Sequence, residues 1–90
     1  MIKQNLDLNQ LLDLSDKALK NKDYVAAKKI LEKVILTNKD IPEVYNNLGI
    51  ICLNSKNIKA SINYFEQAIK LNPKFSMAYC NLGLAYNKIS

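Results

Sequence analysis

Residues 45–49 read YNNLG, and residues 79–83 read YCNLG. Gly83 follows Gly49 by 34 positions, and the same spacing relates two longer stretches without a gap. These are residues 23–35, DYVAAKKILEKVI, and residues 57–69, NIKASINYFEQAI. A fixed period of this length is typical of proteins that stack copies of one supersecondary unit, because a single unit cannot bury its own apolar face.

The spacing of apolar residues predicts that each unit is a pair of helices. In residues 24–36 and 58–71 the apolar side chains recur at steps of three and four, which places them on one helical face. Pro42 fits the first turn of a helix, Asn72-Pro73 ends one, and Ser76 is a candidate N-cap. The sequence therefore predicts five helices joined by short loops, at about residues 8–21, 24–37, 42–55, 58–71 and 76–89.

The composition argues against catalysis and against bound metal. The 90 residues include no His and only two Cys, and no glycine-rich phosphate loop is present. Asp13 and Asp16 lie three apart, which is more typical of a solvated helix face than of an acid/base pair. We expect no enzyme activity, no cofactor and no metal site, and we expect Cys52 and Cys80 to be buried, reduced thiols.

The charge and hydropathy patterns bear on partners and location. The net charge is +5, and every positive residue is Lys. Without Arg, and without exposed stacking aromatics, specific nucleic-acid recognition is not expected. No apolar run is long enough for a membrane span or a signal peptide, so the sequence predicts a soluble, cytoplasmic protein with no membrane partner.

The repeat resembles the tetratricopeptide repeat, a 34-residue helix–turn–helix unit. Its signature is matched in the second unit by the following residues: Tyr45, Leu48, Gly49, Ser61, Phe65, Ala68 and Pro73. Cys52 departs from it, where Tyr is usual. The first unit is more divergent and has Leu11, Ser15, Val34 and Lys39 at signature positions. The resemblance implies an all-α, right-handed superhelical solenoid of about two and a half units in one domain, 1–90. The units are about residues 8–41, 42–75 and 76–90.

The same resemblance implies how the helices pack. Gly49 and Gly83 would let the two helices of a hairpin approach closely, and Phe65 and Leu31 would fill the gap between adjacent hairpins. The helix at 76–89 is apolar over a wide arc. It is therefore a terminal cap, an edge that self-associates, or an internal helix of a longer array, and we favour the last two.

In this family the first helix of each unit lines a groove that binds peptides. The groove residues implied here are Asn46, Asn47, Ile50, Asn54, Cys80, Asn81, Leu84, Asp13 and Asp16. Asn47 and Asn81 share one register and could form an asparagine ladder along a peptide backbone; the alternative is that they bond neighbouring protein groups. Asp13 holds that position in the first unit. The carboxylate clamp that binds chaperone tails is not expected, because its basic positions hold Leu12, Asp13, Asn46 and Cys80.

The sequence thus predicts a protein–protein interaction module, a scaffold or adaptor that binds a peptide or a partner domain. Its expected partners are proteins, with possible self-association through the helix at 76–89. The alternative is a substrate-recruiting or dimerising arm of a larger enzyme, such as a glycosyltransferase or sulfotransferase. The residues themselves leave both open.

Overall fold

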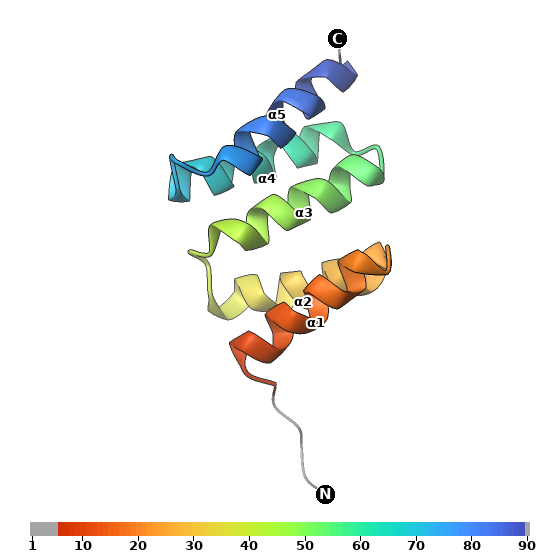
Figure 1. Cartoon of the computed structure of the whole chain (residues 1–90), viewed down its shortest axis with the longest axis vertical. Helices are drawn as coiled ribbons and strands as arrows, with labels where there is room; N and C mark the ends of the chain where they lie inside the picture. The colour runs from red at the N-terminus through yellow and green to blue at the C-terminus, as the bar shows by residue number, and fades with distance from the viewer. Residues whose placement is uncertain (1–5, 90) are drawn as a thin grey trace, which may run out of the picture. The chain divides into compact units, whose positions relative to one another are not determined.

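The computed structural model describes residues 6–89, which form five α-helices and, over that range, no strand (Figure 1). The helices are α1 (Leu8–Lys20), α2 (Tyr24–Thr37), α3 (Pro42–Asn54), α4 (Ile58–Leu71) and α5 (Ser76–Ile89). Each predicted helix is present, with ends that differ by at most one residue. The predicted all-α array of helix hairpins is confirmed.

The chain divides into two units, one ending at Lys39 and one beginning at Asp40. In the first unit, α1 and α2 pack against each other as a hairpin. Asp7 caps α1 in a reciprocal capping box, in which the Gln10 N–H donates to Asp7 Oδ1 (2.8 Å) and the Asp7 N–H donates to Gln10 Oε1 (2.9 Å). Buried side chains of α2 form the core of this hairpin together with Ser15 of α1: Ala27, Leu31 and Val34.

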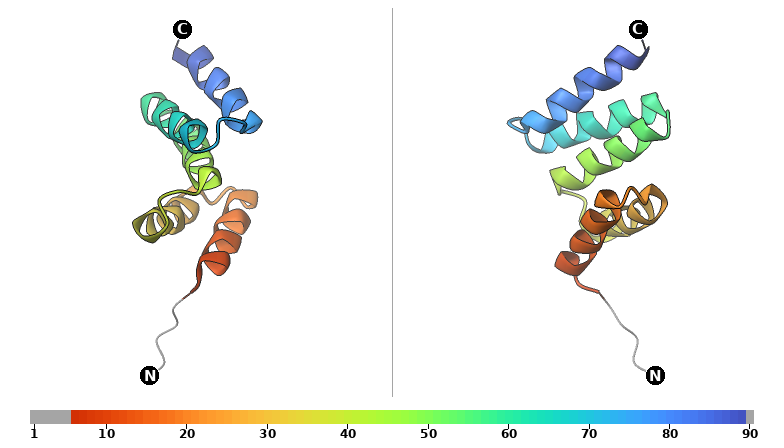
Figure 2. Two further views of the ribbon diagram at one scale, coloured as in Figure 1. Left: turned by 90° about the vertical axis from the view of Figure 1, so that its left-hand side faces the viewer. Right: turned by 45° about the vertical axis from the view of Figure 1, so that its right-hand side comes forward.

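The turns of the two hairpins have the same backbone geometry. Lys22 and Lys56, 34 positions apart, adopt left-handed φ angles of 59° and 64°. In the first turn the Lys22 N–H donates to the Leu19 carbonyl (3.0 Å) and the Asp23 N–H donates to the Ala18 carbonyl (2.8 Å). The second turn repeats this pair of bonds. The pattern is a Schellman motif, which ends one helix and reverses the chain so that the next runs antiparallel (Figure 2).

The second unit consists of α3, α4 and α5. Helix α4 packs against both α3 and α5, and α3 also contacts α5. Pro42 starts α3, where its missing N–H would have no helical partner. The core combines fully buried residues from all three helices: Val44, Leu48, Phe65, Ala68, Ala78 and Ala85.

Gly49 shows why α3 and α4 can approach closely. A Cβ atom at Gly49 would lie 2.6 Å from Cδ1 and 2.8 Å from Cζ of Phe65, and nearer still to Cε1. Phe65 thus fills the space inside its own hairpin, against a residue that has no side chain. At Gly83 a Cβ would meet nothing within 4 Å among the described residues, so the close approach expected there stays a prediction.

Two expectations need correction at α5. Ser76 is the first residue of α5 and not its cap, because the Phe75 carbonyl accepts the N–H groups of Ala78 (3.1 Å) and Tyr79 (3.4 Å). Cys52 and Cys80 form no disulfide, but only Cys52 is buried, whereas Cys80 is exposed. Cys80 lies on the side of α5 that faces away from the buried Ala78 and Ala85.

Candidate functional site

Residues of α3 and α5 that were predicted to line a groove meet through one hydrogen bond. Asn81 Nδ2 donates to Asn46 Oδ1 over 3.1 Å, which links α5 to α3. Asn46 is only 3% exposed, whereas Asn81 is half-buried. The bond joins Asn81 to Asn46. Asn47, which occupies the same repeat position in α3 as Asn81 does in α5, is also half-buried.

The other predicted residues of these two helices differ in exposure. Ile50 is half-buried, and the exposed Asn54 donates from its Nδ2 to the Ile50 carbonyl (3.0 Å). On α5, Cys80 and Leu84 are exposed. We define the α3–α5 face by the following residues: Asn46, Asn47, Ile50, Asn54, Cys80, Asn81 and Leu84. The set combines amide and apolar side chains, and Asn46 contributes almost no exposed amide because it is buried.

Asp13 and Asp16 belong to the first unit, on α1. Both are exposed. Asp13 Oδ2 pairs with Lys17 Nζ over 3.3 Å, one helical turn further on, with both side chains largely solvated. Such an exposed i,i+4 pair contributes only a few tenths of a kcal/mol to stability.

A cavity of about 280 Å³ lies where α3 ends, α4 begins and α5 ends. Its lining residues are Leu53, Asn54, Lys56, Ile58 and Lys88. Two of them are apolar and two are cationic, and none of the five carries a carboxylate. The cavity shares Asn54 with the α3–α5 face.

Comparison with known proteins identifies the fold family. A family model described as tetratricopeptide repeat matches residues 42–75, and a second model of the same description matches residues 64–90. The chain belongs to the tetratricopeptide repeat family. Tetratricopeptide repeats mediate protein–protein interactions in general, so the chain is an interaction module in that broad sense.

A curated tetratricopeptide repeat protein is similar over most of this chain. It is the tetratricopeptide repeat domain-containing protein PYG7, chloroplastic, of Arabidopsis thaliana, which is 36% identical over 83 residues. The match covers 88% of this chain and 28% of the Arabidopsis protein. The chain thus spans little more than a quarter of the length of this tetratricopeptide repeat relative.

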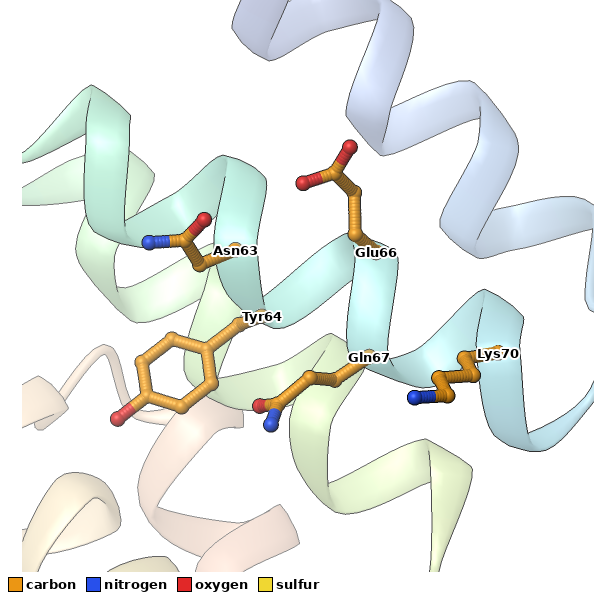
Figure 3. A pocket seen from close by; sticks show the side chains of 5 residues that line it. All are labelled: Asn63, Tyr64, Glu66, Gln67 and Lys70. Atoms are coloured by element: carbon orange, nitrogen blue, oxygen red, sulfur yellow. The ribbon is translucent and has the colours of Figure 1, made fainter.

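A second cavity lies on α4, outside the surfaces that the tetratricopeptide repeat pattern pointed to. It has a volume of about 440 Å³ and is lined by Asn63, Tyr64, Glu66, Gln67 and Lys70 (Figure 3). In Figure 3 the Tyr64 and Gln67 side chains extend to one side of α4, and Glu66 extends to the other. The signal in the sequence was a polar stripe at steps of three and four, which solvated helix faces also show.

Residues 6–89 contain no group of three or more His, Cys, Asp or Glu side chains that could hold a metal ion. Over the same range, no helix is long and apolar enough to cross a membrane.

Proposed function

We propose that the α3–α5 face binds an extended peptide segment of a partner protein. The observation that carries this proposal is the cavity of about 280 Å³, which shares Asn54 with the face. Ile50 and the exposed Leu84 supply apolar surface, and the cavity adds a recess for one side chain. Recessed apolar surface with a few polar groups is the usual form of a binding site.

The asparagines supply the polar contacts of the proposed site. A side-chain amide has two N–H donors and a carbonyl acceptor, so the bond to Asn46 leaves Asn81 with capacity for a peptide backbone. Asn47, half-buried on α3, is the proposed second backbone contact. Pairing through backbone groups would fix a peptide on the face without reading its side chains.

The cavity determines which peptide fits best. Leu53 and Ile58 would cover an apolar side chain, while Lys56 and Lys88 would face a carboxylate. We therefore propose a peptide that carries an apolar residue beside an acidic group. These lysines lie at other positions than the basic residues of the carboxylate clamp, so a chaperone tail is not implied.

A phage library of random twelve-residue peptides, selected on the full chain, tests the proposal. The affinity of an enriched peptide is then measured by calorimetry on Leu84→Lys and on the matched control Leu36→Lys, at an exposed position of α2. We expect Leu84→Lys to weaken binding by at least about tenfold, the effect of roughly 1.4 kcal/mol, and Leu36→Lys to leave it unchanged. Equal affinities for both variants, or no enriched peptide, would contradict the proposal.

Further variants separate the parts of the site. Asn47→Ala should weaken binding with little change in the melting curve. Asn81→Ala should also lower stability, because the buried Oδ1 of Asn46 loses its partner. Lys88→Ala should reduce the preference for acidic peptides over their amide counterparts; an unchanged preference would remove the carboxylate from the proposal but keep the peptide.

The role proposed here is non-catalytic, as the family membership supports. We also propose the cytoplasm as its location, because Cys52 and Cys80 are not joined in a disulfide, as expected in a reducing compartment. Cell fractionation tests this location. The alternative role, an arm of a larger enzyme, stays a prediction.

A further inference from the structure

The side of α2 opposite its buried residues carries the two most exposed large apolar side chains of the described chain. Val25 is 69% exposed and Leu36 is 78% exposed. They are eleven positions apart, close to three helical turns, so they lie on the same side of α2 and about 16 Å apart at 1.5 Å per residue. Exposed charged residues lie between them. We call this surface the α2 outer face and define it by the following residues: Val25, Lys28, Lys29, Glu32, Lys33 and Leu36.

The same repeat positions in α4 show that the fold does not require apolar residues there. Val25 and Leu36 correspond to Lys59 and Lys70, 34 positions later, and both lysines are exposed. Helix α4 has a complete hairpin before it in the chain and α2 has one after it, yet these positions are exposed in both helices. Their exposure therefore belongs to the repeat itself. Since lysine is accommodated at both positions, Val25 and Leu36 are available for a contact outside their own hairpin.

The charge of the α2 outer face indicates which partner it suits. Its three lysines outnumber its one carboxylate, on Glu32, which gives it a net charge of +2. Within the described part of the chain none of these lysines forms a salt bridge. At the positions of Lys29 and Lys33, helix α4 carries the neutral Asn63 and Gln67. Charge complementarity therefore favours a partner with an excess of carboxylates.

We propose that the α2 outer face binds an acidic amphipathic helix of a partner protein, which lies along α2. Two apolar side chains of that helix, eleven positions apart, would contact Val25 and Leu36, because both helices rise by the same 1.5 Å or so per residue. Carboxylates between these two positions would face the lysines, and a basic residue would face Glu32. Spaced apolar anchors on an amphipathic helix are a common means of recognition between proteins.

A protein helix fits this surface better than a membrane or a nucleic acid. A helix that lies on a membrane buries one continuous apolar side and keeps its charges on the other. Glu32 is seven positions after Val25 and four before Leu36, so its carboxylate lies on the side that would have to enter the lipid. A nucleic acid would leave both apolar side chains without a partner, and the face contains neither Arg nor an aromatic ring.

Selection of helical peptides on the full chain tests the proposal. A phage library displays a monomeric helix that is randomised along one side. It is selected on the wild-type chain and depleted on the double variant Val25→Lys, Leu36→Lys, which carries the residues that α4 has at these positions. We expect enriched peptides with two apolar residues eleven positions apart and a net negative charge. If no peptide distinguishes the wild type from the double variant, the proposal is wrong.

The affinity of an enriched helix, measured by fluorescence anisotropy, separates the contributions of the face. Leu36→Lys should weaken binding at least about tenfold. Lys29→Asn combined with Lys33→Gln, again the residues of α4, should weaken it by about threefold to tenfold and reduce its dependence on salt. Circular dichroism shows whether each variant keeps its helices.

Leu84→Lys is the matched control, because it makes the same change at an exposed position of the α3–α5 face. It should change the affinity for the acidic helix less than twofold. The two sites can therefore fail independently, since Leu84→Lys is expected to weaken only the groove peptide and Leu36→Lys only the acidic helix. Equal losses of the acidic helix from both variants would contradict a site on α2.

Co-sedimentation with vesicles of phosphatidylcholine and phosphatidylserine decides between a protein helix and a lipid surface. At physiological salt we expect the wild-type chain and the double variant Val25→Lys, Leu36→Lys to remain in the supernatant alike. Vesicle binding by the wild type that the double variant loses would overturn the proposal and assign the α2 outer face to an anionic membrane.

Discussion

The two hairpins, α1–α2 and α3–α4, use different residue pairs at the same two repeat positions. The second hairpin has Gly49 and Phe65, and the first has Ser15 and Leu31. All four residues are buried. In the second hairpin the ring of Phe65 occupies the place of a Gly49 side chain. In the first, the corresponding residues are a hydroxyl-bearing side chain and an aliphatic residue smaller than phenylalanine. We infer that the combined size of the pair is what the hairpin constrains.

Ser15 also shows how a polar residue is accommodated in this position. Its Oγ donates to the Leu12 carbonyl over 2.8 Å, within its own helix. Ser61 on α4 does the same with the Ile58 carbonyl over 2.6 Å. Because the hydroxyl is satisfied locally, burial of serine leaves no polar group unpaired, and each side chain acts as a small residue in the packing.

The largest expected effect is that of removing the large member of each pair. Phe65→Ala should lower the free energy of unfolding by about 3–5 kcal/mol, because it leaves a cavity in a fully buried site. Leu31→Ala should cost about 2–5 kcal/mol. Urea unfolding followed by circular dichroism measures both. If Phe65→Ala cost less than about 1 kcal/mol, the ring would not be a main packing element of the second hairpin.

Exchange of residues between the hairpins tests whether the combined size of the two residues is what the hairpin constrains. Gly49→Ser should destabilise by about 1–3 kcal/mol, because its side chain would overlap the Phe65 ring. The double variant Gly49→Ser, Phe65→Leu reproduces the pair found in the first hairpin. It should be less destabilised than the sum of its single changes, and a double-mutant cycle measures the coupling. Strict additivity would mean that the two positions are independent.

A smaller effect of opposite sign is expected at Gly83. Since a Cβ there meets nothing, Gly83→Ala should stabilise the chain by about 0.5–1 kcal/mol through helix propensity alone. Gly49→Ala should be destabilising, although the substitution is the same. Thermal unfolding at low micromolar concentration measures both. Destabilisation by Gly83→Ala under those conditions would show that something covers this position.

Much of the fold could be predicted from the sequence, because the signals that set the helix ends act between residues close together in the chain. Helix ends followed from Pro42, from Asn72-Pro73 and from the apolar period, all of which act within a few residues. The packing around Gly83 could not be predicted in this way, because its sequence context matches that of Gly49 while its surroundings in the structure differ. A repeat pattern predicts which residue stands at a position, but not whether a neighbouring helix covers it. Cys80 was assigned to the interior for the same reason.

The candidate site was predictable only as a set of positions. The register placed Asn46, Asn47 and Asn81 on first helices, and the α3–α5 face contains them. Which amides bond to each other depends on the offset between α3 and α5, and that offset is a property of tertiary packing. The bond from Asn81 to Asn46 therefore came from the structure alone. The cavity with Lys56 and Lys88 also combines residues from separate elements.

The smallest expected effect concerns the turns, where the two hairpins agree. Lys22 adopts a φ of 59°, which costs a residue with a Cβ about 1–2 kcal/mol, whereas glycine adopts it freely. Glycine loses about 0.5–1 kcal/mol more conformational entropy on folding, so Lys22→Gly should stabilise by roughly 0.5 kcal/mol. Its N–H keeps the bond to the Leu19 carbonyl. Lys28→Gly, in the interior of α2, is the control and should cost about 1 kcal/mol. Chemical denaturation of the two variants side by side measures this difference. Equal losses for both would mean that the left-handed turn is not formed in solution.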